Sequence, residues 1–186
     1  MALVPLTEKT LMMILPWRNA PEVRQSMFHQ NIISEAEHQA WFLRLQQNDH
    51  ARWFVHEKAG VYDGVVYFTD INWQDRSTLW GFYLAPEAAR GSGTQLGLDG
   101  LDMAFGTLQL ETVYAKVLTD NEKSIRFHLK LGFEPLVLQE AADIVQTPET
   151  QSYHAFSLNK QCWQQQRQNI LDKIGLTIKN NNETFK

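Results

Sequence analysis

Apolar and polar positions change period several times along the chain, and these changes divide it into short strands and amphipathic helices. The segments Arg52–Glu57, Gly64–Asn72 and Ser77–Leu84 are rich in aromatic and β-branched residues, and short polar turns separate them. This pattern predicts three strands in an antiparallel meander. Upstream, the short apolar run Thr10–Leu15 predicts a first strand.

Two helices are expected between that first strand and the meander. Asn19 stands shortly before Pro21, an arrangement typical of a helix start. Ser34 is followed three residues later by Glu37, which forms a capping box, and Trp41 then lies on the apolar face of the predicted helix.

The second half of the chain alternates helices with strands. A helical period predicts an amphipathic helix through Leu98, Leu101, Phe105 and Leu108. The remaining predicted elements are a strand at Thr112–Leu118, a helix from Asn121 to Leu131 that ends at Gly132, strands at Leu136–Leu138 and Tyr153–Leu158, and a helix from Asn159 to Ile174. We expect a single domain over residues 1–178 and a disordered tail over residues 179–186.

Composition excludes several classes of protein. A chain of 186 residues with 44% apolar residues can bury the core of one ordinary domain, and its net charge of −4 argues against a nucleic-acid partner. Cys162 is the only cysteine, so neither an intrachain disulfide nor a thiolate zinc cluster is expected, and a cytoplasmic location fits. No signal peptide, membrane span or metal-ligand spacing of histidines is found in the sequence.

The loop after the strand Ser77–Leu84 carries the clearest functional pattern. It contains Arg90-Gly91-Ser92-Gly93 at the expected start of a helix, where backbone N–H groups and the helix dipole favour an anion. No Gly-Lys-Ser/Thr follows, so a P-loop is excluded, and no Gly-x-Gly-x-x-Gly leads to an acidic residue placed for a ribose, so a Rossmann site is not expected. We expect a pyrophosphate ligand; the alternative is a glycine loop that only turns the chain.

This loop, with the segments at 121–125 and 130–133, resembles the GNAT superfamily of N-acetyltransferases in order and spacing. The resemblance covers roughly Thr10 to Leu158. It implies an α+β fold with a single twisted, mixed central sheet of about seven strands, flanked by helices, in which the fourth and fifth strands splay apart. By position these strands are Ser77–Leu84 and Thr112–Leu118.

The same resemblance implies that acetyl-CoA is the cosubstrate and that its pantetheine arm lies between the splayed strands. The residues expected to bind it are Leu84, Arg90, Gly91, Ser92, Gly93, Thr94, Gln95, Asn121 and Ser124. Gln95 departs from the family pattern, which has a small residue there, so its side chain is expected to turn outward.

Two groups are expected to take part in catalysis. The backbone N–H near Leu84 is the candidate donor to the oxyanion. His128 occupies the position of a tyrosine acid in many relatives, and a protonated imidazole can donate to the departing thiolate. The alternative is a packed histidine with a backbone partner. Water is expected to remove the amine proton.

The N-terminal half resembles the acetyltransferases of the pseudaminic acid pathway, through the segments 17–21, 23–24, 33–34 and 38–42, with 69–72 and 81–86 extending the match. The resemblance implies acetylation of the 4-amino group of a UDP-linked 4-amino-4,6-dideoxy sugar, for modification of flagellin or a surface glycan. It places Arg18 and His38 at the nucleotide, and Thr69, Asp70 and Tyr83 around the acceptor sugar. The alternatives are a surface ion pair for Arg18, a polar helix face for His38 and a strand-end cap for Asp70.

Two other functions stay open at this stage. A protein N-terminus or a ribosomal-protein amine is the alternative acceptor, because acidic residues are frequent between Asp63 and Asp75. The other alternative is a regulatory module that binds acetyl-CoA without transferring the acetyl group. Edge strands and the C-terminal helix leave a homodimer open.

Overall fold

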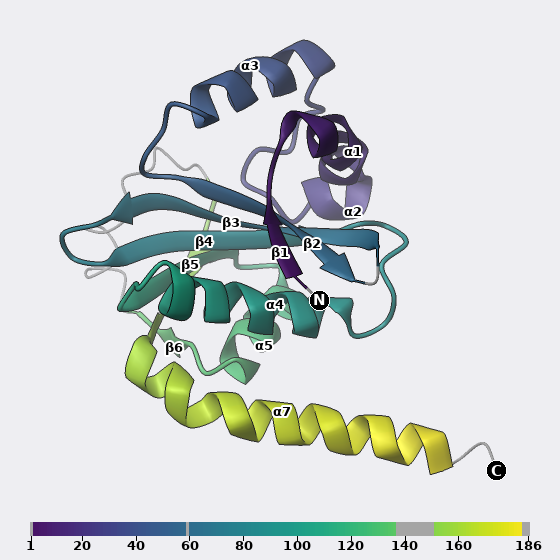
Figure 1. Ribbon diagram of the computed structural model, residues 1–186, viewed down its shortest axis with the longest axis vertical. Helices are drawn as coiled ribbons and strands as arrows, with labels where there is room; N and C mark the ends of the chain where they lie inside the picture. The colour runs from purple at the N-terminus through teal and green to yellow at the C-terminus, as the bar shows by residue number, and fades with distance from the viewer. Residues whose placement is uncertain (1, 59, 137–150, 184–186) are drawn as a thin grey trace.

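A computed structural model describes residues 2–58, 60–136 and 151–183, with side chains as far as Lys173. Seven strands form one mixed sheet in the order β1-β2-β3-β4-β5-β7-β6. Helices α1, α2 and α3 cover one face of this sheet, and α4, α5 and α7 lie on the other (Figure 1). One mixed sheet of seven strands flanked by helices is the overall architecture expected from the sequence.

The element bounds are as follows. The strands are β1 (Ala2–Pro5), β2 (Arg52–Lys58), β3 (Val61–Asn72), β4 (Ser77–Leu84), β5 (Thr112–Leu118), β6 (Glu134–Pro135) and β7 (Tyr153–Asn159). The helices are α1 (Glu8–Asn19), α2 (Pro21–Arg24), α3 (Glu35–Leu45), α4 (Ser92–Asp102) with a π-helical turn at Met103–Thr107, α5 (Glu122–Lys130) and α7 (Lys160–Glu183). No helix in the described ranges is both long and apolar enough to cross a membrane.

The predicted first strand is wrong, because Thr10–Leu15 lies inside helix α1. Thr7 caps this helix: its backbone N–H donates to Thr10 Oγ1 at 3.1 Å, which stabilises the first turn. Leu11, Ile14 and Leu15 then fall on one buried side of the helix. The true first strand is β1, which pairs with β2.

Several predicted ends are also corrected. Asn19 ends α1 rather than starting a helix, and α2 begins at Pro21. Strand β6 lies at Glu134–Pro135. Of the predicted strand Leu136–Leu138, only Leu136 is among the described residues, and it is not part of a strand. Helix α7 continues to Glu183, so residues 179–183 of the expected tail are helical.

Strands β4 and β5 are splayed, as expected. They pair in parallel only where Ser77–Leu79 meets Thr112–Tyr114. Beyond Leu79 no pairing joins them in the described chain, whereas β5 stays paired with β7 along its whole length, Thr112–Leu118. The C-terminal half of β4 therefore has an edge without a strand partner.

Candidate functional site

Strand β4 presents backbone groups to the gap that opens beside it. The Ala85 N–H donates toward β3, to the Asp63 carbonyl at 3.0 Å. Because hydrogen-bonding directions alternate along a strand and Leu84 lies opposite Gly64, the Leu84 N–H points away from β3 and into the gap. The backbone of Leu84 is thus oriented as an oxyanion donor or a partner for an extended ligand.

A buried polar atom without a partner lies where the gap begins. Trp80 follows Leu79, the last residue of β4 that pairs with β5. Its side chain is 5% exposed, and its Nε1–H has no acceptor among the described residues. Such a group is rare in a finished core, and the Trp80 ring itself packs in the main core cluster.

The loop between β4 and α4 has the geometry of an anion site. Gly91 has a φ of +94°, a conformation that favours glycine. The N–H groups of Thr94 and Gln95 donate to the Gly91 carbonyl, at 3.0 and 3.2 Å. The amides of Arg90, Gly91 and Gly93 have no hydrogen-bond partner in the part of the chain that the structure describes, which suits a pyrophosphate at this helix start.

Two side chains of this loop are already engaged within the protein. Ser92 is 3% exposed and its Oγ donates to Asp63 Oδ2 at 2.6 Å. Gln95 Nε2 donates to Asp99 Oδ1 at 2.8 Å, so its side chain lies along α4 toward the next turn. Gln95 can therefore occupy the usual small position without covering the exposed amides of Arg90 and Gly91.

Helix α5 begins beside the other expected cofactor residues. Asn121 Oδ1 accepts the Ser124 N–H at 3.0 Å, which makes Asn121 the N-cap that its residue type predicts. Both side chains are half-buried. They remain candidates for contact with the pantetheine or the adenylate.

His128 is enclosed by aromatic rings. The rings of Trp80, Phe133 and Phe156 lie 5.0 to 5.8 Å from its own, and the side chain is 4% exposed. Its Nδ1–H donates to the Ser124 carbonyl at 2.8 Å. Burial lowers the pKa of His128 to about 4, and this hydrogen bond only partly offsets the effect.

This geometry favours the packed histidine over the catalytic acid. At neutral pH the ring is uncharged, and its one proton is on Nδ1, which bonds to the Ser124 carbonyl. The other nitrogen is then an acceptor and cannot deliver a proton to a thiolate.

The buried neutral His128 predicts acid sensitivity. Because its pKa is lowered in the folded state, the unfolded chain binds a proton first as pH falls below 6.5, and stability is lost down to about pH 4. We expect a loss of about 3 kcal/mol in the free energy of unfolding over this range, measured by denaturant titration. Over the same pH range, the free energy of unfolding of His128→Phe should fall by about 3 kcal/mol less than that of the wild type. Equal losses in the two proteins would contradict the assignment.

Arg18 lies at the end of α1, between the sheet and the segment after α2. Its Nη2 donates to the His29 carbonyl at 2.8 Å, whereas Nη1 is buried without a partner among the described residues. Partial burial lowers the pKa of Arg18, and its charge acts on both Tyr67 and Tyr83. A buried guanidinium N–H without an acceptor is the feature expected of a group that awaits an anion.

Tyr67 and Tyr83 project from neighbouring strands on the same face of the sheet. Burial raises the pKa of both phenols, so both hydroxyls stay protonated at neutral pH. The Tyr67 ring lies against the backbone of Gly81, where a Cβ would overlap it. Tyr83 is 5% exposed and packs with the apolar cluster under α1.

His38 belongs to the packing between α1 and α3. It is 4% exposed, its Nε2 bonds to the Leu11 carbonyl at 3.0 Å, and its ring stacks on Trp41 at 5.1 Å. Burial lowers its pKa, so the ring is neutral. The side chain therefore lies neither on a polar helix face nor in a position open to a nucleotide.

Asp70 borders a separate pocket at the far end of the gap. Asp70 has a φ of +50° within an irregular stretch of β3 and lines a pocket of about 380 Å³ with Asp75 and Tyr114. Thr69 contributes its carbonyl to the Thr78 hydroxyl at 2.8 Å. Leu84 is five positions further along β4 than Leu79, which lines this pocket, and the two are therefore about 17 Å apart.

One polar cluster was missed in the sequence. His56, Asp63 and Asp99 come from β2, β3 and α4 and meet in the core. A histidine that follows two buried residues of a strand needs polar partners. That need was the one sign in the sequence that polar residues from elsewhere in the chain would meet His56. The described residues hold no group of three or more His, Cys, Asp or Glu that could bind a metal ion.

Comparison with known proteins identifies the family of this chain. Residues 1–134 match the family model of the acetyltransferase (GNAT) domain. Acetyltransferase PseH from two Campylobacter jejuni strains, serotypes O:2 and O:23/36, is 28% identical over 128 residues, or 69% of this chain and 79% of the relative. A Vibrio cholerae spermidine N-acetyltransferase, solved with CoA and spermine, has a TM-score of 0.74 at 22% identity, covering 87% of this chain and 96% of its own.

The family match spans most of the chain, and the structure has the splayed strands and the loop with unpartnered amides that the family resemblance implied. The chain therefore belongs to the GNAT family and is an acetyl-CoA-dependent N-acetyltransferase.

Proposed function

We propose that this enzyme transfers the acetyl group of acetyl-CoA to the 4-amino group of a UDP-linked 4-amino-4,6-dideoxy sugar. The product would enter the pseudaminic acid pathway in the cytoplasm, for modification of flagellin or a surface glycan. The similarity to PseH over 128 residues is the observation that carries this proposal. The sequence resemblance to acetyltransferases of this pathway includes the segment around Arg18, and the structure leaves one guanidinium nitrogen of Arg18 without a partner among the described residues.

The two substrates would approach the sheet from different directions. The pantetheine arm extends along the edge of β4, with the pyrophosphate at the amides of Arg90, Gly91 and Gly93. The diphosphate of the nucleotide sugar would approach Arg18, whose positive charge and free N–H provide charge-assisted hydrogen bonds. Both substrates are then bound together, as direct attack in a ternary complex requires.

The chemical step needs few side chains. The neutral sugar amine attacks the thioester carbonyl, and the Leu84 N–H donates to the developing oxyanion. Water accepts the amine proton and supplies a proton to the departing thiolate. His128 would shape the apolar wall of the site rather than exchange protons, because its one N–H, on Nδ1, donates to the Ser124 carbonyl.

A cationic amine is the second candidate acceptor. Asp70 and Asp75 line the pocket of about 380 Å³ at the paired end of β4 and β5, and no lysine or arginine lines it. Two carboxylates there would attract the ammonium group of a peptide or another polyvalent amine. Such a substrate would use the same acetyl-CoA site.

Inhibition by UDP separates the two acceptors. If the nucleotide binds at Arg18, UDP should compete with the sugar substrate and should be non-competitive toward acetyl-CoA. Initial rates at several UDP concentrations measure both patterns. If UDP fails to inhibit at millimolar concentration and the enzyme acetylates a short peptide or spermidine, the nucleotide sugar is not the acceptor. A cationic amine is then the substrate.

A further inference from the structure

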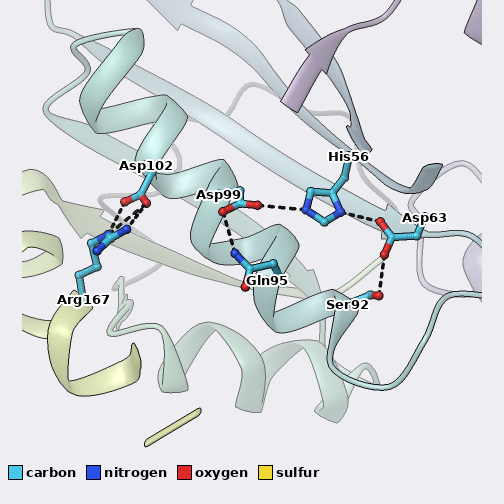
Figure 2. A network of polar contacts seen from close by, with 7 residues as sticks. All are labelled: His56, Asp63, Ser92, Gln95, Asp99, Asp102 and Arg167. Carbon is cyan, nitrogen blue, oxygen red and sulfur yellow. Dashed lines mark hydrogen bonds and ion pairs between the residues drawn. The ribbon is translucent and has the colours of Figure 1, made fainter. Parts of the chain in front are cut away.

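A line of buried polar groups joins the core of the sheet to the loop expected to bind the pyrophosphate. His56 lies between two carboxylates: its Nδ1 is 2.5 Å from Asp63 Oδ1, and its Nε2 is 3.0 Å from Asp99 Oδ2. Asp63 Oδ2 accepts from Ser92 Oγ at 2.6 Å, and Gln95 Nε2 donates to Asp99 (Figure 2). Ser92 and Gln95 belong to the first turn of α4.

The arrangement requires a charged imidazole. Carboxylates only accept hydrogen bonds, so both ring nitrogens of His56 must donate, which makes the ring an imidazolium. The hydrogen bond to Asp99 raises the pKa of His56, with Asp63 contributing, although complete burial opposes the rise. Burial would raise the pKa of Asp63, but the hydrogen bonds from Ser92 and His56 outweigh it and lower that pKa.

Asp63 holds both ends of the loop. Its backbone carbonyl accepts the Ala85 N–H at 3.0 Å where the loop leaves β4, and its carboxylate accepts the Ser92 hydroxyl where the loop enters α4. The residues between, including Arg90 and Gly91, are mostly exposed. One buried residue thereby fixes the two points from which the unpartnered amides are presented, one through its backbone carbonyl and one through its carboxylate.

We propose that Asp63, Ser92 and His56 are positioning residues for acetyl-CoA, holding the loop 85–93 in the shape that binds the pyrophosphate. The His56 charge has a second effect, because it offsets one of two carboxylates placed beneath the start of α4, where they oppose the anionic ligand. This inference rests on the proposed placement of the pyrophosphate at residues 90–95 and is independent of the acceptor.

The same helix offers a matched control. One turn beyond Asp99 on α4, Asp102 accepts from Arg167 at 2.7 Å (Figure 2). Asp102 also accepts from Trp163 Nε1 at 3.1 Å, and the two bonds connect α4 to α7. This ion pair stabilises the helix without contact to the loop. Asp102→Asn should therefore lower the melting temperature and leave the affinity for CoA unchanged.

The test measures CoA binding by calorimetry without any acceptor, together with the KM for acetyl-CoA and kcat. Ser92→Ala should raise the Kd of CoA and the KM about five- to tenfold, with kcat at saturation nearly unchanged, since one hydrogen bond that orients the loop is lost. Ser92→Thr, which keeps the hydroxyl, should restore affinity. Affinity equal to wild type in Ser92→Ala, with only a lowered melting temperature, would overturn the inference.

A pH series on the wild type needs no destabilised variant. The groups that face His56 are Asp63 on β3 and Asp99 on α4; Lys58 on β2 acts on Asp63, and Arg167 on α7 acts on Asp99. CoA affinity should weaken as pH rises through the His56 titration, and His56→Asn should lack this step. Identical pH profiles in the two proteins would contradict the proposed role of the charge.

The outcome also separates this inference from the loop assignment. If a bulky residue at Gly93 weakens CoA binding while Ser92→Ala does not, the loop binds CoA but the buried residues do not position it. If neither substitution has an effect, the loop assignment itself is wrong.

Discussion

Replacing Gly93 with tryptophan is expected to weaken CoA binding by at least tenfold, about 1.4 kcal/mol, while leaving the fold intact. Gly93 lies in the first turn of α4, and its N–H, like those of Arg90 and Gly91, has no hydrogen-bond partner in the described chain. A large side chain there would occupy the space that the pyrophosphate needs. Calorimetry with CoA measures the effect.

Gly93→Ala is the matched control for this substitution. A Cβ at Gly93 would meet only Leu84 Cδ1, at 3.4 Å, which is close to ordinary contact. Alanine in a helix is also no worse than glycine for stability. We therefore expect near wild-type affinity in Gly93→Ala; tight CoA binding by Gly93→Trp would show that the pyrophosphate lies elsewhere.

Replacing Arg18 with methionine is expected to raise the KM for the nucleotide sugar by about 10- to 100-fold, because charge-assisted hydrogen bonds contribute about 1.5–3 kcal/mol each. The KM for acetyl-CoA should stay the same, since the residues expected to bind it lie along the unpaired edge of β4 and in the segments that follow this strand. Steady-state kinetics with each substrate varied in turn measures both values.

Arg24→Met controls for damage to the segment after α2. Arg24 donates to the carbonyls of Asn19 and Gln30, much as Arg18 donates to that of His29, but no Arg24 nitrogen is buried without a partner in the described chain. Arg24→Met should leave the KM for the sugar within about twofold of the wild-type value, a difference well under 1 kcal/mol. If both substitutions raise that KM equally, Arg18 acts through the fold and not on the diphosphate.

The part of the fold that is expected to hold acetyl-CoA could be predicted because its signals are local. The observed bounds of β4 and β5 are the predicted ones, and Asn121 and Ser34 cap their helices as expected. β-branched runs and capping side chains act within a few residues, so they can be recognised without tertiary contacts.

The N-terminal segment shows where local pattern fails. The apolar run Thr10–Leu15 is compatible with a buried strand and with a buried helix segment, and periodicity alone cannot distinguish them. The cap formed by Thr7 and Thr10 decides the outcome, because it satisfies the first amides of a helix. The actual first strand, Ala2–Pro5, has only four residues and depends on its pairing with β2.

The candidate site could be predicted only in its backbone. The unpartnered amides follow from glycine positions that the sequence shows directly. In contrast, the environments of His38 and His128 depend on rings contributed by distant segments, and burial makes both histidines neutral. The cluster around His56 joins residues up to 43 positions apart, which no spacing rule describes.

The most direct test of the proposed reaction is a thiol-release assay with acetyl-CoA and the purified UDP-linked 4-amino-4,6-dideoxy sugar, run beside peptide amines and spermidine. The account predicts rapid CoA release with the nucleotide sugar alone and one acetyl group on its 4-amino nitrogen. Release with peptides or spermidine but not with the sugar would leave the GNAT assignment in place and contradict the proposed substrate.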